Sequence, residues 1–165
     1  FRQFHWFMKE TLMRIAGMTV ALFCLGMLAS GGCTPAANPN IPELVPVDGT
    51  VSMDGAPLAN ASVVFIPAGA TQGGPSYGLT DEGGRYALEY QAGQKGAPVG
   101  EFKVVCSKWI MPDGSDYVGV PGGPSPMEAG AKEKLSPKFS DENATTLKAT
   151  VPAGGGTINF DLTEK

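Results

Sequence analysis

The side chains that most often carry out catalysis are scarce in this chain. Its single histidine is His5, which lies ahead of a predicted cleavage site, so the exported chain would contain none. That excludes histidine general bases, Ser-His-Asp triads and histidine-ligated zinc from the exported part. We therefore predict no catalytic residue, no cofactor and no enzymatic activity.

Acidic residues offer two further candidates for chemistry. The run Asp113-Gly114-Ser115-Asp116 resembles part of a calcium-binding loop, but it lacks the glycine and the terminal glutamate at the required spacing. A polar turn is the preferred interpretation, and no metal site is predicted. The carboxylates at 81–82 and 141–142 are adjacent in sequence, so they point apart in a strand or turn and do not suit paired acid and base catalysis.

The three cysteines have three different expected fates. Cys24 lies inside an apolar leader, and Cys33 follows a run of small residues that is typical of a lipid attachment site. Cys106 is then the only remaining thiol, so no disulfide is expected. Because Cys106 alternates with Phe102 and Val104, we predict that it points into the core as an inert, buried thiol.

Aromatic residues are the remaining candidates for a binding site. Tyr77, Tyr90, Trp109 and Tyr117 could stack on a sugar, although the alternation of its strand assigns Tyr90 to the core. Trp109 and Tyr117 are the pair retained as a candidate ligand-binding site. They flank or lie in a Gly- and Pro-rich loop at 109–134, and loops of that length are commonly functional or disordered. A merely mobile loop is the alternative.

Residues 1–32 are predicted to be a targeting segment. Lys9 and Arg14 give it a basic start, 15–28 is apolar, and 29–32 are small residues ahead of Cys33. The apolar run is shorter than the roughly 20 residues of a membrane span. The segment resembles a bacterial lipoprotein signal peptide, which implies diacylation of Cys33, although Ser30 stands where that pattern prefers leucine. An ordinary signal peptide and a soluble exported protein are the alternative.

A proline-rich tether is predicted at 33–46, where prolines at 35, 39, 42 and 46 favour an extended spacer. The leader contains Arg2, Lys9 and Arg14 against Glu10, so its removal changes the formal net charge from −4 to −6. An acidic chain without a basic patch argues against binding to nucleic acid.

Seven short strands account for the apolar alternation in the rest of the chain. Asp54-Gly55 is a strong hairpin signal, and 81–84 reads as a second turn. Pro57 is expected to keep its segment out of a central ladder, and Pro67 to end the second strand. This pattern predicts an all-β, seven-stranded antiparallel sandwich. The predicted strands are 47–53, 61–66, 76–80, 85–90, 101–108, 147–151 and 158–162.

Several of these turn and strand motifs resemble the carboxypeptidase regulatory-like family, which has a transthyretin-like or Ig-like sandwich. The resemblance covers 47–165 and implies a fold, with an aromatic near 139 packing on the sandwich edge. It says almost nothing about function. The motifs are Gly49-Thr50-Val51, Asp54-Gly55-x-Pro57-Leu58, Ala61-x-Val63-x-Phe65-x-Pro67 and Thr80-Asp81-x-x-Gly84-x-Tyr86.

Together these observations predict an exported lipoprotein of the bacterial cell envelope. It would be held to the membrane by a lipid anchor and would act as a non-enzymatic binding or structural module. The expected partner is an envelope protein or a polysaccharide. The alternative is a dedicated carbohydrate-binding β-sandwich domain.

Overall fold

The computed structural model describes residues 41–120 and 122–164. The predicted signal peptide, Cys33 and the first part of the tether lie outside this range. Strands dominate the described residues, which confirms the predicted all-β class. None of the described helices is long and apolar enough to cross a bilayer.

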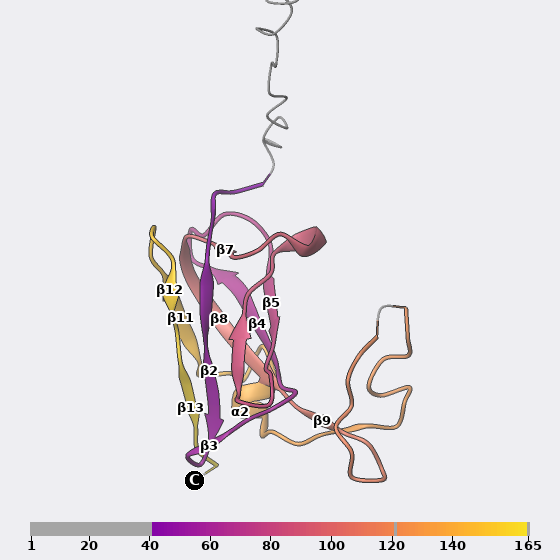
Figure 1. The fold of residues 1–165 in the computed structure, drawn as a ribbon. Coiled ribbons are helices and arrows are strands. Elements are labelled where there is room, and N and C mark those ends of the chain that lie inside the picture. Colours follow the sequence, from indigo (N-terminus) through magenta and orange to yellow (C-terminus); the bar gives the residue numbers. More distant parts are fainter. Residues whose placement is uncertain (1–40, 121, 165) are drawn as a thin grey trace, which may run out of the picture. The chain divides into compact units, whose positions relative to one another are not determined.

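One sheet is antiparallel throughout and has the strand order β11-β8-β4-β5 (Figure 1). Its longest ladder joins β4 and β8 through seven residue pairs, from Ser62 opposite Ser107 to Ala68 opposite Glu101. The strands are β4 (Ser62–Ala68), β5 (Ser76–Leu79), β8 (Gly100–Ser107) and β11 (Lys148–Val151).

The second sheet is built around β2, which pairs with strands on both of its edges. β3 and β6 run antiparallel to β2, whereas β12 and β13 run parallel to it. The prediction of a purely antiparallel sandwich is therefore wrong here. After β11 the chain crosses to the other sheet and runs along β2 in the same direction. The strands are β2 (Val47–Met53), β3 (Ala56–Pro57), β6 (Arg85–Ala87), β12 (Gly156–Thr157) and β13 (Phe160–Leu162).

Short elements complete the fold and extend it at both ends of β8. β1 (Leu44–Val45) pairs with β7 (Ala97–Pro98), and β9 (Trp109–Ile110) pairs with β10 (Lys132–Glu133). A 3-10 turn, η1, covers Gln91–Gly93, and the helix α2 covers Pro137–Ser140. These additions make the predicted count of seven strands too low for the described residues. Because β1 belongs to the fold and Val45 is buried, the tether ends earlier than predicted.

The two predicted turns form for the reasons that the sequence suggested. Asp54 and Gly55 both have positive φ, 49° and 84°, as a two-residue hairpin of the primed type requires. The Asp81 carboxylate accepts hydrogen bonds from the backbone N–H groups of Gly83 and Arg85, each at 2.8 Å.

The two prolines have different outcomes: Pro57 stays out of a central ladder as expected, whereas Pro67 lies inside β4 and does not end it. Pro57 is on β3, an edge strand, where the missing N–H costs little. Pro67 is paired with Phe102 of β8. The ladder between β4 and β5 already ends where Phe65 lies opposite Ser76. Pro67 therefore has no partner on β5 that would need its missing N–H group.

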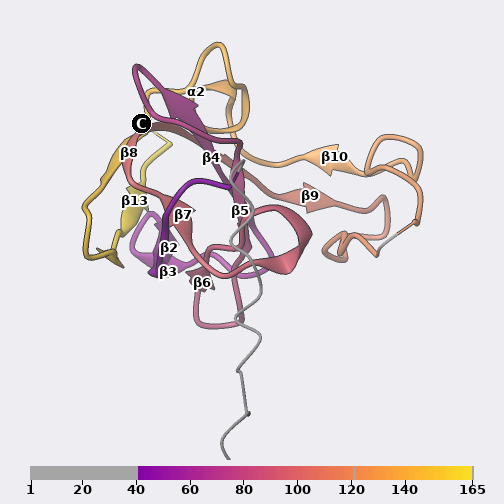
Figure 2. The same ribbon diagram turned by 90° about the horizontal axis from the view of Figure 1, so that it is seen from above.

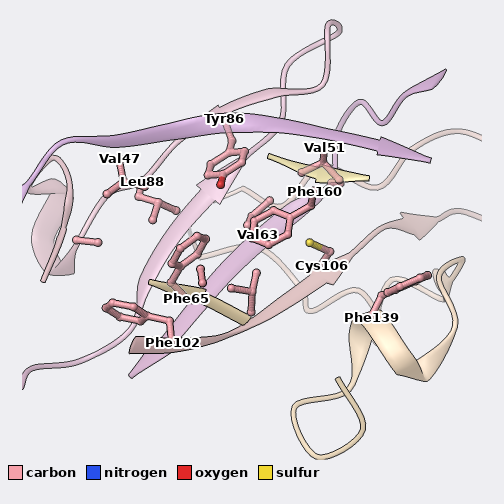
Figure 3. Packing of buried hydrophobic residues seen from close by; sticks show 14 of the residues in the cluster. Val47, Val51, Val63, Phe65, Tyr86, Leu88, Phe102, Cys106, Phe139 and Phe160 are labelled. Atoms are coloured by element: carbon pink, nitrogen blue, oxygen red, sulfur yellow. The ribbon is translucent and has the colours of Figure 1, made fainter. Parts of the chain in front are cut away.

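The core lies between the two sheets and is centred on Phe65 (Figure 3). Its ring centroid lies 5.6 Å from that of Phe102, 6.4 Å from that of Tyr86 and 6.0 Å from that of Phe160. Tyr86 and Phe160 come from the opposite sheet, so the aromatic cluster joins the layers. Phe139 of α2 is buried in the same core, in agreement with the aromatic expected at the sandwich edge.

Candidate functional site

The loop predicted at 109–134 folds into an ordered arm, the name used below for these residues. β9 and β10 pair at its base, and Ile110 forms an isolated bridge with Asp116. The arm leaves the sandwich after β8 and extends beyond the strands in both views (Figures 1 and 2). The base of the arm is held by backbone pairing.

A polar cluster fixes the arm to the sandwich. The Lys108 ammonium donates to the Ala59 carbonyl at 2.6 Å and to the Asp116 carboxylate at 2.8 Å. The Asn60 amide donates to the same carboxylate oxygen at 2.9 Å. The hydrogen bond from Lys108, followed by that from Asn60, holds the pKa of Asp116 below its ordinary value. We call these three side chains the arm lock.

The returning strand of the arm is held in the same place. The Glu133 carboxylate accepts hydrogen bonds from the backbone N–H groups of Lys108 and Leu135, both at 2.9 Å. The backbone N–H of Lys134 donates to the Lys108 carbonyl at 2.8 Å. Both ends of the arm are thus anchored at Lys108, and the residues between them project from a rigid base.

Trp109 and Tyr117, the predicted aromatic pair, are brought together by the arm. The backbone N–H of Tyr117 donates to the Trp109 carbonyl at 2.9 Å, and both side chains are half-buried. The Tyr117 hydroxyl donates to the Pro124 carbonyl. These contacts show that Tyr117 holds the arm together, and they leave less of its ring and hydroxyl for a ligand than the sequence suggested.

The most exposed apolar side chains of the arm were missed by sequence reasoning. Val118, Val120 and Met127 have exposed fractions of 49%, 65% and 75%. No periodic pattern marks them, because the segment is broken by glycine and proline. The sequence feature that could have identified them is the presence of three apolar residues in a loop that has no strand to pack against. We call them the arm tip.

Two turns shape the described part of the arm. Asp113 forms a turn in which its carboxylate accepts from the backbone N–H and the hydroxyl of Ser115, so the polar-turn interpretation is confirmed. A second hydrogen-bonded turn lies at 125–131, where Ser125 and Glu128 bond to each other as a capping pair. Residues 132–133 are strand β10.

The arm and the tether join the sandwich at opposite ends of β8. β1 follows the tether and pairs with β7, which leads directly into the start of β8 at Gly100. β9 follows the other end of β8 at Ser107. Eight strand residues separate the two ends, or about 26 Å. In Figure 1, β7 and β9 lie towards opposite ends of the sandwich.

A second exposed surface lies on the outer face of β4 and β5. Tyr77 and Leu79 have exposed fractions of 51% and 53%. They line an open groove of about 570 Å³ together with Ser62, Ala87 and Glu89. Sequence reasoning had named Tyr77 only in passing, whereas its companion Tyr90 is buried as predicted.

Comparisons of the chain with models of known protein families, with curated proteins and with solved structures give no match.

Proposed function

We propose that this chain is a lipid-anchored, non-enzymatic binding module of the bacterial cell envelope, related to the carboxypeptidase regulatory-like family. Cys33 attaches it to the membrane, and the arm binds a partner protein of the envelope. One observation carries the proposal: the exposed arm tip stands on a locked base, at the end of the sandwich opposite the tether.

The anchor part of the proposal rests on the leader and the tether. A basic, apolar and small-residue order precedes Cys33, and prolines follow it. Two acyl chains on one cysteine would hold the protein firmly, since a single chain gives only marginal membrane binding. The tether leads into the sandwich at β1.

The binding part rests on the contrast between the base and the tip of the arm. The base is fixed by a buried ammonium group and several short hydrogen bonds. The tip exposes Val118, Val120 and Met127. Burying these side chains against a partner would remove apolar surface from water, which favours binding. Binding residues commonly lie on loops that a rigid scaffold positions, and apolar contacts favour a protein surface as the partner.

Site-specific photo-crosslinking in the native host tests this proposal. A photoreactive residue in place of Val120 should form a discrete adduct with an envelope protein. The same residue in place of Val99, which is 39% exposed and lies next to β7, is the matched control and should not form it. Adducts of the same kind and yield from both positions, or no adduct from Val120, would contradict binding through the arm tip.

A further inference from the structure

A row of directly opposed side chains crosses the outer face beside the groove. Tyr77 of β5 lies opposite Val64 of β4, and Val64 lies opposite Val105 of β8. On its other side Tyr77 is bridged to Glu89, and Glu89 is bridged to Lys95. Opposed residues of antiparallel strands point to the same face, with Cβ atoms about 5 Å apart. The row therefore runs from two valines, through an exposed aromatic ring, to a carboxylate and an ammonium group.

The polar groups at the end of this row are available to a ligand. Among the described residues, neither the Glu89 carboxylate nor the Lys95 ammonium forms an ion pair or a side-chain hydrogen bond. The Ser62 hydroxyl lines the same groove and makes only one long contact, 3.5 Å, with the Ser107 carbonyl. An aromatic ring, a carboxylate and a hydroxyl thus line one open groove, and Lys95 lies opposite Glu89 by strand pairing just outside that lining.

We propose that this groove binds a neutral glycan chain, with a sugar ring stacked on Tyr77. A sugar ring has an apolar face of C–H groups and a rim of hydroxyls, which matches an exposed aromatic ring beside polar groups. Glu89 accepts hydrogen bonds from sugar hydroxyls, and Lys95 donates to them. The Glu89 carboxylate in the groove and the Lys95 ammonium paired beside it carry opposite charges, so the two together add no net charge that would select a charged polymer. Because the groove is open, a chain can continue past the stacked ring.

An added peptide strand suits this surface less well. The backbone N–H and C=O of Tyr77 are already bonded to Glu89, at 2.8 and 2.7 Å. β5 has only four residues, and this pairing occupies its outer edge near the middle. A peptide that joined the sheet would need a longer run of free backbone groups. The available groups at the groove are side chains, which favours a ligand recognised by stacking and hydroxyl contacts.

The test is binding of the full-length protein in detergent to an array of immobilised neutral glycans, covering chains of hexose and of N-acetylhexosamine. We expect binding to at least one of them. Tyr77→Ala should weaken it about tenfold, and Tyr77→Phe should retain it to within about threefold, because the ring carries the stacking. Tyr117→Ala, which removes a half-buried ring of the arm, is the control and should leave glycan affinity unchanged. Because Tyr77 is half exposed, unchanged thermal unfolding of Tyr77→Ala should confirm that it folds.

Three results would overturn the proposal: no glycan bound, equal binding by wild type and Tyr77→Ala, or Tyr77-dependent binding of peptides without binding of glycans. A further measurement checks the neutrality of the ligand, since affinity should change less than about twofold between 0.05 and 0.5 M salt. A steep loss with salt would contradict it. The site is separate from the arm, so Tyr77 variants should leave the Val120 crosslink intact and either proposal can fail alone.

Discussion

Single residues decide whether the segment that leads into β13 can pack beside β2 in the second sheet. Gly49 of β2 faces the segment just before β13, and a Cβ atom placed there would lie 1.7 Å from the Ile158 carbonyl oxygen. The Tyr86 hydroxyl donates to that same carbonyl at 2.7 Å. Burial raises the pKa of this hydroxyl above its ordinary value. The parallel pairing of β2 and β13 therefore requires a residue without a Cβ atom at position 49.

Gly49→Ala should lower the free energy of unfolding by about 3 kcal/mol, the upper end of the cost of over-packing, because the added methyl group must displace backbone. Gly154→Ala is the matched control. An added Cβ at Gly154 meets nothing within 4 Å, so its effect should stay within about 0.5 kcal/mol. Urea unfolding of the two variants gives the comparison. Equal stabilities would show that β13 does not pack on β2 in this way.

Cys106 should behave as part of the core. It is fully buried beside Val104, and burial raises the pKa of its thiol to about 12. The native protein should therefore react with a thiol reagent at pH 8 only as fast as it unfolds. Cys106→Asp should cost about 3 kcal/mol or more by burying an unpaired charge, whereas Cys106→Ala should cost about 1 kcal/mol. Rapid labelling of the native thiol would show that the inward register of β8 is wrong.

At the scale of elements, local signals predicted far more than long-range ones. The strands on β2, β4 and β8 follow from alternation, and the turn at Asp54 follows from two residues. The parallel pairing of β13 depends on which strand it meets, which no local pattern encodes. The arm lock unites three separate segments through Asn60, Lys108 and Asp116. Sequence reasoning therefore gave Lys108 only a place in a strand, gave Asn60 no structural role, and weighed Asp116 only as a calcium ligand or part of a polar turn.

The arm lock should control how often the arm opens. Lys108→Met removes the donor that holds Asp116, so the backbone N–H of Tyr117, bonded to Trp109, should exchange with solvent about tenfold faster. The backbone N–H of Val104, bonded to Leu147 within the sandwich, is the internal control and should keep its rate. Uniform acceleration of both would mean that Lys108 supports the whole fold and not the arm.

The lock should also be sensitive to acid. The pKa of Asp116 is lower in the folded protein than its ordinary value of about 4, so the folded state binds the proton less readily. Its stabilisation of the arm is present above pH 4 and is lost as the pH falls through the lowered pKa. Protection of the Tyr117 backbone N–H, expressed relative to an unfolded peptide at the same pH, should therefore fall below pH 4 in the wild type, and Asp116→Asn should remove that acid dependence. A wild-type profile that stays flat below pH 4 would contradict it.

At the scale of the whole molecule, the two ends of the sandwich have different expected roles. The tether joins at β1, beside the start of β8, and the arm begins at the other end of that strand. The proposed anchor at Cys33 and the proposed binding surface of the arm are separate questions, and each is tested by itself.

The anchor is tested by metabolic labelling with a fatty-acid analogue. Wild-type protein should incorporate the label and remain with membranes, because diacylation gives firm attachment. Cys33→Ala should lose both properties, whereas Cys106→Ala should lose neither, since Cys106 is buried. Equal labelling of wild type and Cys33→Ala would rule out this cysteine as the acyl acceptor.

Replacing the outer part of the arm tests the central claim most directly. A short Gly-Ser link in place of 118–130 removes the arm tip but keeps Asp116 and the lock, and the shorter loop changes the closure entropy only modestly. The variant should remain folded and membrane-attached but should no longer recover the protein crosslinked through Val120, whereas Val99→Ser should recover it normally. Full recovery by the folded, shortened variant would show that the arm is not the binding site.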